Sequence, residues 1–387
     1  MTAIWWRRLP EIMAGSGATV ARLMCNLCCA RAVTTAPSNV SSNAPAIRGG
    51  LLALMAAALF GISTPLVQRL GVDLGAFSTA ALLYGGAALV GAFSLRPKEQ
   101  EARVRRSDTG RLLAMALFGA VIGPVALAWG LQRTSGASAS LMLTLEALFT
   151  ALLAWRLYGE SMDRRVWLAM LLLLAGGMAL VLDQGLTGGV QLTGLLVVML
   201  ATAAWGVDNT LSRALAERDP SQVVMLKAAL GASLTTGLAW LSNEPLPSWT
   251  AALGLLAVGA TGYGVSLRLY LLAQRAFGAA RTGSVFAFAP FIGAAFAFAL
   301  GDRSAGGWMV LGGLLMLCGV ALHLAEIHGH EHVHEPMDHE HAHDHSDGHH
   351  NHSHNPTVIG THSHLHHHEE VRHSHAHVPD AHHQHVH

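Results

Sequence analysis

The residues with the clearest chemistry are histidines, and all 25 of them lie at or after His323. Many alternate with one other residue, a spacing that lets neighbouring imidazoles of an extended chain reach one metal ion. Imidazole has a pKa of about 6.5, so most of these rings can act as ligands at neutral pH. No thiol accompanies them, and nearby acids add oxygen ligands, which suits Ni(II), Zn(II), Co(II) or Cu(II). The alternating candidates are His328, His330, His332, His334, His339, His341, His343, His345, His362, His364, His366, His373, His375 and His377.

A second group of candidates consists of ionisable residues inside long apolar segments. An unpaired charge there costs roughly 2.5–3.5 kcal/mol on insertion scales. We expect Glu146 and Asp208, with Asn209, to face a central cavity and to bind substrate or a coupling proton. Lys227 and Arg281 would balance the acids or hold an anionic part of the substrate. A purely structural ion-pair network is the alternative.

Two prolines also lie inside apolar segments. Pro65 and Pro290 cannot donate a backbone hydrogen bond, so each should break the helical bonding around it. In transporters such breaks line cavities. We therefore include both prolines in the expected transport pathway, with a tolerated kink as the alternative.

The composition indicates an all-α polytopic membrane protein. Only 12% of the 387 residues are charged, against about 25% in a soluble domain, and the mean hydropathy is +0.39. The formal net charge is zero, so nucleic acid is not an expected partner. No P-loop or G-x-S-x-G motif is present, so we expect neither an enzyme nor a required cofactor.

Ten apolar segments are each long enough to cross a hydrocarbon core of about 30 Å as a helix. They lack the alternation of barrel strands, which leaves helices as the structure that satisfies the backbone in lipid. The expected spans are 50–69, 76–95, 112–131, 136–157, 166–182, 193–212, 222–241, 250–272, 279–300 and 307–325.

The spans are expected to form two five-helix halves between two extensions. Residues 1–46 have no sustained apolar run and should be a disordered extension, unless the start codon has been placed too early. Residues 47–183 and 190–325 form the two halves, and residues 326–387 are the histidine-rich tail. The tail has no apolar periodicity, so we expect disorder in the absence of metal.

Basic residues predict the orientation, because loops rich in Lys and Arg stay in the cytoplasm. The loop R-P-K-E-Q-E-A-R-V-R-R-S-D-T-G-R, at 96–111, should be cytoplasmic, whereas 183–194 has no basic residue and should lie outside. Both termini are then cytoplasmic, in the inner membrane of a bacterium. Arg133 and Arg303 fall on expected outer loops and weaken this pattern.

The two halves repeat each other. F-G-I-S-T-P-L from Phe60 is similar to W-G-V-D-N-T-L from Trp205, and Q-R-x-x-G occurs at both 132–136 and 274–278. Because five is an odd number, the second half must cross the membrane in the opposite sense. Inverted repeats of this kind place a substrate site near the midplane of secondary transporters.

The chain also resembles the EamA-type branch of the drug/metabolite transporter superfamily over residues 47–325. The resemblance rests on A-L-F-G-I-S-T-P-L, on T-S-G-A-S-A-S-L-M-L-T-L-E-A-L-F-T-A-L-L-A-W-R-L-Y-G-E, and on A-R-T-G-S-V-F-A-F-A-P-F-I-G-A. It implies ten helices and gradient-driven solute movement, often export. Many members of this family carry proline at the position of Glu146, and the helix usually breaks there. Because this chain has glutamate instead, the resemblance does not decide whether its helix breaks.

Three functions fit these features. The first is a secondary-active exporter of a small organic solute with a metal-binding cytoplasmic tail. The second is a divalent transition-metal (Ni, Co or Zn) transporter whose tail collects or senses its cargo. The third is a membrane-anchored metal buffer that transports nothing. The expected partners are the lipid bilayer, the solute and metal ions, and a homodimer remains open.

Overall fold

The computed structural model describes most of the apolar region and four pieces of the tail. In the tail, and at a few helical positions, the description covers the backbone. The expected extension 1–46 lies almost wholly outside the described residues, which are 44–95, 102–158, 162, 164–212, 215, 218–277, 279–304, 306–324, 329–334, 337–343, 362–368 and 371–376.

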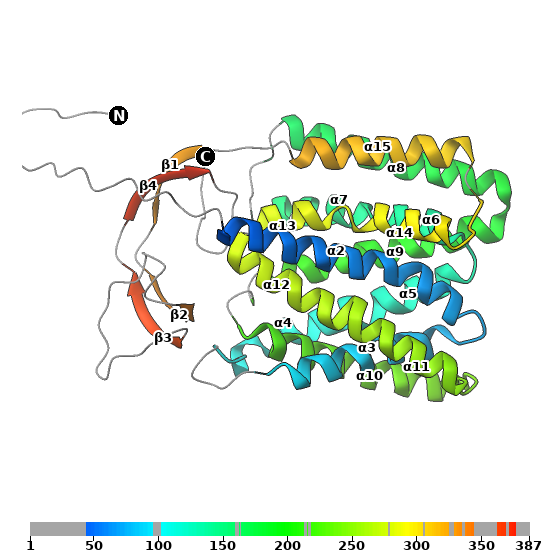
Figure 1. Ribbon diagram of the computed structural model, residues 1–387, viewed down its shortest axis with the longest axis horizontal. Helices are drawn as coiled ribbons and strands as arrows, with labels where there is room; N and C mark the ends of the chain where they lie inside the picture. The colour runs from blue at the N-terminus through cyan, green and yellow to red at the C-terminus, as the bar shows by residue number, and fades with distance from the viewer. Residues whose placement is uncertain are drawn as a thin grey trace, which may run out of the picture. The chain divides into compact units, whose positions relative to one another are not determined.

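The described chain from Ala44 to Leu324 is helical throughout, and its helices run side by side along one axis (Figure 1). The first expected half contains α2 (Ala44–Leu70), α3 (Ala76–Phe93), η1 (Arg106–Asp108), α4 (Thr109–Met115), η2 (Ala116–Ile122), α5 (Gly123–Leu131), α6 (Gly136–Met142), α7 (Leu145–Tyr158) and α8 (Arg164–Thr187). The second contains α9 (Gly189–Ser212), α10 (Pro220–Leu241), α11 (Trp249–Val258), η4 (Gly259–Val265), α12 (Ser266–Phe277), α13 (Ala279–Phe286), α14 (Ala289–Ala299) and α15 (Gly307–Leu324).

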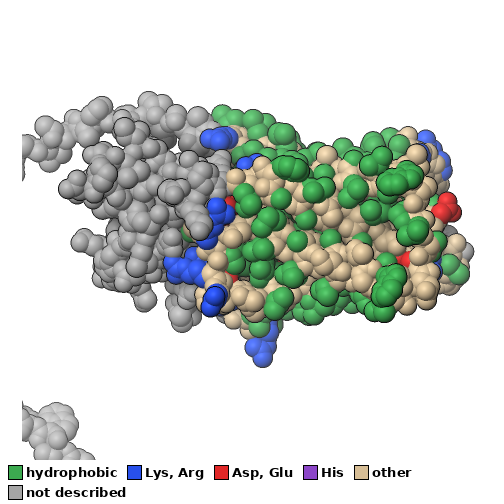
Figure 2. Space-filling model, turned by 90° about the horizontal axis from the view of Figure 1, so that it is seen from below, with side chains coloured by type: hydrophobic (Ala, Val, Ile, Leu, Met, Phe, Trp, Pro, Cys, Tyr) green, Lys and Arg blue, Asp and Glu red, His purple; other side chains and the backbone are tan. Residues whose placement is uncertain are grey.

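Eight helical stretches of the described chain are long and apolar enough to cross a membrane. Two further apolar helices, Ala289–Ala299 and Gly307–Leu322, are shorter by this measure. Apolar side chains such as Leu171 and Leu174 are exposed. Figure 2 shows apolar side chains spread over the middle of one face, with Lys and Arg toward its two ends. This is the surface of a polytopic helical membrane protein, because lipid solvates the apolar middle.

Two of the expected spans, the fourth and the ninth, are interrupted in the structure, whereas the first is continuous. The fourth span is broken after Met142 although it has no proline, and bonds such as Thr144 N–H to Leu141 O (3.0 Å) tighten the chain there. The ninth span is broken at 287–288, just before Pro290. The first span is one helix through Pro65, as the alternative of a tolerated kink allowed. Pro65 removes one donor from α2, which neighbouring bonds and packing can absorb.

Two π-helical segments were not foreseen. The segments η2 and η4 are seven residues each and occupy the middle of the third and eighth spans. A π-turn widens the helix and is often found at functional sites. The segment η4 contains three glycines, and η2 contains one glycine and two alanines, which lets neighbouring helices approach them closely.

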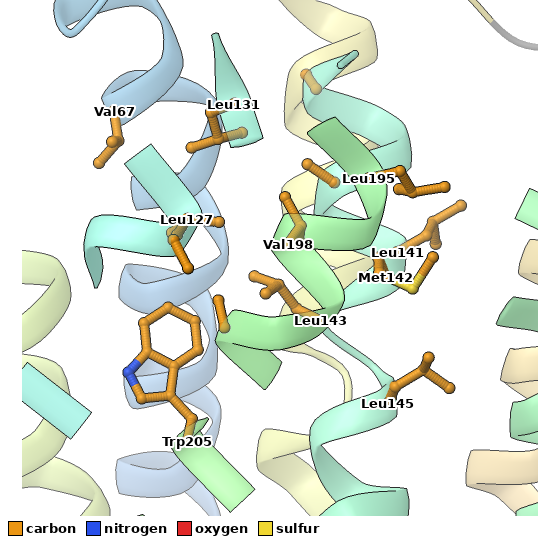
Figure 3. Packing of buried hydrophobic residues seen from close by; sticks show 14 of the residues in the cluster. Val67, Leu127, Leu131, Leu141, Met142, Leu143, Leu145, Leu195, Val198 and Trp205 are labelled. Atoms are coloured by element: carbon orange, nitrogen blue, oxygen red, sulfur yellow. The ribbon is translucent and has the colours of Figure 1, made fainter. Parts of the chain in front are cut away.

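Glycines set the closest helix crossings. A β-carbon on Gly86 would lie 2.1 Å from the carbonyl oxygen of Leu256, so α3 and α11 meet backbone to backbone. A β-carbon on Gly176 of α8 would lie 2.8 Å from the carbonyl oxygen of Gly312 on α15. These contacts confirm that glycines form close-packing surfaces between helices, as expected for helices in lipid. Between the crossings, Leu127, Leu195 and their neighbours fill the interior (Figure 3).

One end of the bundle, where α2 ends and α3 begins, is held by side chains that bond to backbone groups of other helices. The amide of Gln68 donates to Leu131 O (3.0 Å) and Thr134 O (2.8 Å). In return, Gln132 donates to the carbonyl oxygens of Gly71 (3.0 Å) and Leu74 (2.7 Å). The two glutamines therefore tie the α2–α3 and α5–α6 turns together in both directions.

Acidic side chains at the same end accept hydrogen bonds from the first N–H groups of helices. Glu244 accepts from Phe77 N (3.1 Å) and Ser78 N (2.7 Å) of α3, and Asp302 accepts from Ala137 N (3.0 Å) of α6. Negative groups are favoured there by the helix dipole. Partial burial raises the pKa of Asp302, but hydrogen bonds from Ser304 and from the α6 backbone outweigh it, and the net direction is downward.

The tail differs from the expected disorder, because the structure gives it four strands in two antiparallel pairs. Strand β1 (Gly329–His334) pairs with β4 (Val371–Ala376), and β2 (Met337–His343) pairs with β3 (His362–His368). Alternation of histidine with another residue has the two-residue period of a strand, which apolar periodicity alone did not reveal. The register sets histidines opposite one another: His330 and His375, His332 and His373, His339 and His366, His341 and His364, and His343 and His362.

The α3–α11 crossing gives a test of the packing. Gly86→Ala should lower the free energy of unfolding by about 1–3 kcal/mol, because the added carbon meets backbone that cannot move aside. Gly237→Ala is the matched control, since nothing lies within 4 Å of its added carbon. Thermal unfolding of the purified proteins in detergent measures both. Equal transition temperatures for the two variants would contradict the close crossing.

Candidate functional site

A cavity with an empty volume of about 690 Å³, including its open part, lies among helices of both halves. It contains four of the residues expected in the transport pathway, which are Glu146, Asp208, Asn209 and Lys227. The remaining lining residues are Phe60, Tyr84, Ala87, Trp205, Val224, Ala228, Gly262, Tyr263, Ser266, Leu267, Tyr270 and Phe286. The sequence therefore placed the principal polar groups of this cavity together correctly.

The break in the fourth span positions Glu146. It is the second residue of α7, directly after the tightened turn, where the helix dipole favours a negative group. Asn209 of α9 donates from Nδ2 to Glu146 Oε1 at 2.5 Å. Both side chains are half-buried, which leaves them in contact with the cavity. An amide orients this carboxylate but does not neutralise it.

Asp208 has a charged partner. Lys227 Nζ of α10 donates to Asp208 Oδ2 of α9, and both residues are only 5% exposed. The other oxygen, Asp208 Oδ1, is buried and has no hydrogen-bond partner among the described residues. A buried pair of this kind costs desolvation but makes each charge tolerable to the other. This oxygen is covered in the structure, with the Gly119 backbone packed against the carboxylate.

The π-helical segment η2 brings its backbone onto this pair. A β-carbon on Gly119 would lie 2.3 Å from the Asp208 carboxylate, so only glycine leaves room. The carbonyl oxygen of Gly119 accepts hydrogen bonds from the hydroxyl of Tyr84 and from Nε1 of Trp205, the latter at 3.0 Å. One backbone group therefore orients two aromatic side chains of the cavity wall.

Six aromatic residues form a continuous wall centred on Phe60. Its ring lies 5.8 Å from Trp205, 5.7 Å from Tyr263 and 5.5 Å from Phe286 between centroids. Tyr84 continues the wall beyond Tyr263 at 5.6 Å, and Tyr270 continues it beyond Phe286 at 5.0 Å. Most of these contacts are edge-on or tilted, which are favourable geometries for aromatic rings.

The remaining candidates lie elsewhere or outside the described side chains. Pro65 lines a separate hollow, at the end held by Gln68, with Arg69 and Asp302. Pro290 is buried in the first turn of α14 and is not part of the cavity lining. The backbone of Arg281 belongs to α13, but its side chain lies outside the described residues.

Metal ligands do not gather in the part of the chain whose side chains are described. No group of three or more His, Cys, Asp or Glu residues occurs there. Of the histidine candidates, His328, His345 and His377 lie outside the described residues, and the others are described only by their backbone. The metal-binding prediction for the tail therefore stays a prediction.

Membrane-length helices around a partly open cavity, which combines an aromatic wall with a few charged groups, form the framework of a solute transporter. The chain belongs to the EamA-like transporter family, whose model matches it twice, at residues 47–182 and 192–325. An uncharacterized transporter of Methanothermobacter thermautotrophicus is 30% identical over 233 residues, covering 58% of this chain and 67% of that protein. A crystal structure with 19% sequence identity superposes with a TM-score of 0.51 over 71% of this chain and 94% of its own, which supports the fold alone.

The aromatic wall is the part of the site that sequence reasoning missed. Phe60 and Trp205 begin the two repeated motifs, and their matched positions were a usable indication that they would meet. Tyr84, Tyr263 and Tyr270 carry no such pattern. The π-helical segments that bring the backbone close have no period that a search for 3.6-residue helices would recognise.

The Asp208–Lys227 pair gives a test of mutual dependence. Lys227→Met should destabilise the protein by about 3–5 kcal/mol, because it leaves a buried carboxylate without a counter-charge. The double variant Asp208→Asn with Lys227→Met should recover much of that loss. Thermal unfolding in detergent, read as a double-mutant cycle, measures the coupling. A double variant no more stable than Lys227→Met alone would exclude a compensating pair.

Proposed function

We propose that this protein is a secondary-active exporter of a small organic solute. The observation that carries the proposal is the cavity between the halves, in which Glu146 and the Asp208–Lys227 pair face an aromatic wall. Charged groups inside a helical membrane protein are costly and usually mark a substrate or ion route. The carboxylates bind the solute or a coupling proton, and the wall holds its apolar part.

In this proposal the halves are inverted repeats, and together they make ten crossings. Several pairs of contacts support the pairing of matched spans: α2 with α14 corresponds to α9 with α7, α2 with α12 corresponds to α9 with α5, and α3 with η4 corresponds to α10 with η2. The pairs α3 with α10 and α8 with α15 each join matched spans directly. Phe60 and Trp205, at matched positions, meet in the cavity wall. Such an arrangement is expected around a pseudo-two-fold axis.

The termini are assigned to the cytoplasm of a bacterial cell, with the protein in the plasma membrane. Support comes from the basic composition of the loop between the second and third spans, and from Arg164, Arg165 and Arg218, which fall in later loops on the same expected side. Asp208 lies four residues before the end of α9, and Arg218 is in the loop that follows. The cavity is therefore nearer the basic end, where a solute leaving the cytoplasm would be collected.

The tail is proposed as a cytoplasmic accessory that binds Ni, Zn, Co or Cu. Its support is the number of histidines and a strand register that sets them opposite one another. The alternative of a divalent metal transporter rests on the tail alone. The described cavity lining contains two carboxylates, with neither histidine nor cysteine, and six aromatic rings that offer poor ligands. A non-transporting metal buffer would need no such cavity.

Flux measurements test the transport proposal. Glu146→Gln and Asp208→Asn should each reduce solute movement in vesicles to the background level, because both remove a charge from the route. Asp73→Asn, at an exposed carboxylate, is the matched control and should keep the flux. The solute is found first by comparing metabolite and metal contents of cells with and without the protein. Normal flux in both cavity variants would overturn the assignment of this site.

Removal of residues 326–387 tests the tail separately. The truncated protein should keep its solute flux but lose most of its equilibrium binding of Ni(II) and Zn(II), because the histidines are concentrated in the tail. Equilibrium dialysis of the full-length and truncated proteins measures the bound metal. Loss of Ni or Zn flux on truncation, with organic solutes unaffected in both proteins, would favour the metal transporter.

A further inference from the structure

We infer that the cavity selects an organic cation: an amine or quaternary ammonium carrying an aromatic or bulky apolar group. The inference rests on the proposed function and adds the class of substrate. It begins with the charges of the described lining, which are two carboxylates and one ammonium. Since Lys227 is bound to Asp208, that pair is neutral as a unit. Among the described residues Glu146 receives an amide N–H and has no charged partner, so within this lining it is the charge left to be matched.

Hydrogen-bonding capacity points the same way. The half-buried carboxylate of Glu146 lines the cavity, and Asp208 Oδ1 is a buried acceptor without a partner in the described structure. The one basic side chain described in the lining is already engaged. An incoming ligand therefore meets the acceptor oxygens of Glu146, which a protonated amine satisfies and a carboxylate does not.

The wall supplies the second half of the recognition. Six rings from α2, α3, α9, η4, α12 and α13 surround the same space, and Phe60 contacts three of them. A cation near an aromatic face gains about 0.5–2 kcal/mol, more when it is desolvated. The rings also offer apolar surface against which a hydrophobic substituent can pack.

Other ligand classes fit less well. An anion would need Lys227 to leave Asp208, and that would create a second unmatched buried carboxylate. A zwitterionic amino acid would gain at Glu146 but meet the same obstacle at its carboxylate. A dehydrated divalent metal would find too few ligands, because the described lining provides two separate carboxylates and an amide.

Three ligands with one ring and different charges test this inference: phenethylamine, phenylalanine and phenylacetate. Their binding to the purified full-length protein is measured by isothermal titration calorimetry. We expect phenethylamine to bind at least about tenfold more tightly than the other two, a factor corresponding to 1.4 kcal/mol. Equal or tighter binding of phenylalanine or phenylacetate, or no binding of phenethylamine, would overturn the inference.

Variants assign the binding to the cavity. Glu146→Gln, which is nearly isosteric, should weaken phenethylamine binding about tenfold or more, whereas Asp73→Asn should leave it unchanged. Phe60→Leu should also weaken it, because Phe60 joins the wall together. If the Glu146→Gln variant does not fold, the Phe60→Leu variant and the three-ligand series determine whether the amine binds in this cavity. Undiminished binding in the folded variants would place the amine elsewhere and refute the site.

Vesicle flux separates this inference from the proposed function. If a neutral or anionic solute is transported in a way that depends on Glu146, and no amine binds, the proposed transport function is supported and the cation specificity is refuted. If an amine binds at Glu146, but neither the amine nor any solute identified from cell contents is transported, the cation site is supported and the proposed transport function is refuted.

Discussion

The central constraint on this molecule is that charges inside a lipid-embedded bundle must be matched locally. Water is not available to solvate Asp208, so Lys227 on the neighbouring helix supplies the counter-charge. The ion pair links α9 to α10, and both of these helices pack against the π-helical segment η2. In the described part of the cavity it also leaves Glu146, oriented by Asn209 on α9, as the acid without a counter-charge. The charge that the cavity offers to a ligand is therefore the one that remains on Glu146 after Asp208 and Lys227 have paired.

Matching at such short range requires backbones to approach closely, and small residues make this feasible. Gly119 is the clearest case, since any side chain there would occupy the space of the Asp208 carboxylate. Its carbonyl group also holds Tyr84 and Trp205. One glycine in a π-helical segment therefore couples the ion pair to the aromatic wall. In lipid, where apolar burial gives little drive for helices to associate, such tight contacts carry much of the stability.

Features that depend on composition and hydrophobic period, such as the helices, could be predicted from the sequence. Features that depend on tertiary contacts, such as helix breaks and π-helical segments, could be predicted less well. Long apolar runs and a few buried charges were sufficient to predict the helices and to group Glu146, Asp208, Asn209 and Lys227. Proline was an unreliable guide to helix breaks: α2 continues through Pro65, whereas the fourth span breaks without one. The breaks and the π-helical segments arise from packing between distant parts of the chain. In the tail, the alternation of histidine was recognised for its chemistry but not for its strand period.

The π-helical segments have a consequence for the surface that each span presents. An i→i+5 turn accommodates more residues per revolution than an α-turn, so the helix that leaves η2 or η4 is rotated relative to the helix that entered it. The stripe of residues facing the interior is therefore out of phase above and below each segment. Attempts to align these two spans with relatives by helical period will slip by a fraction of a turn at Ala116–Ile122 and Gly259–Val265. A single insertion or deletion there could switch a side chain from lipid to cavity without shortening the span.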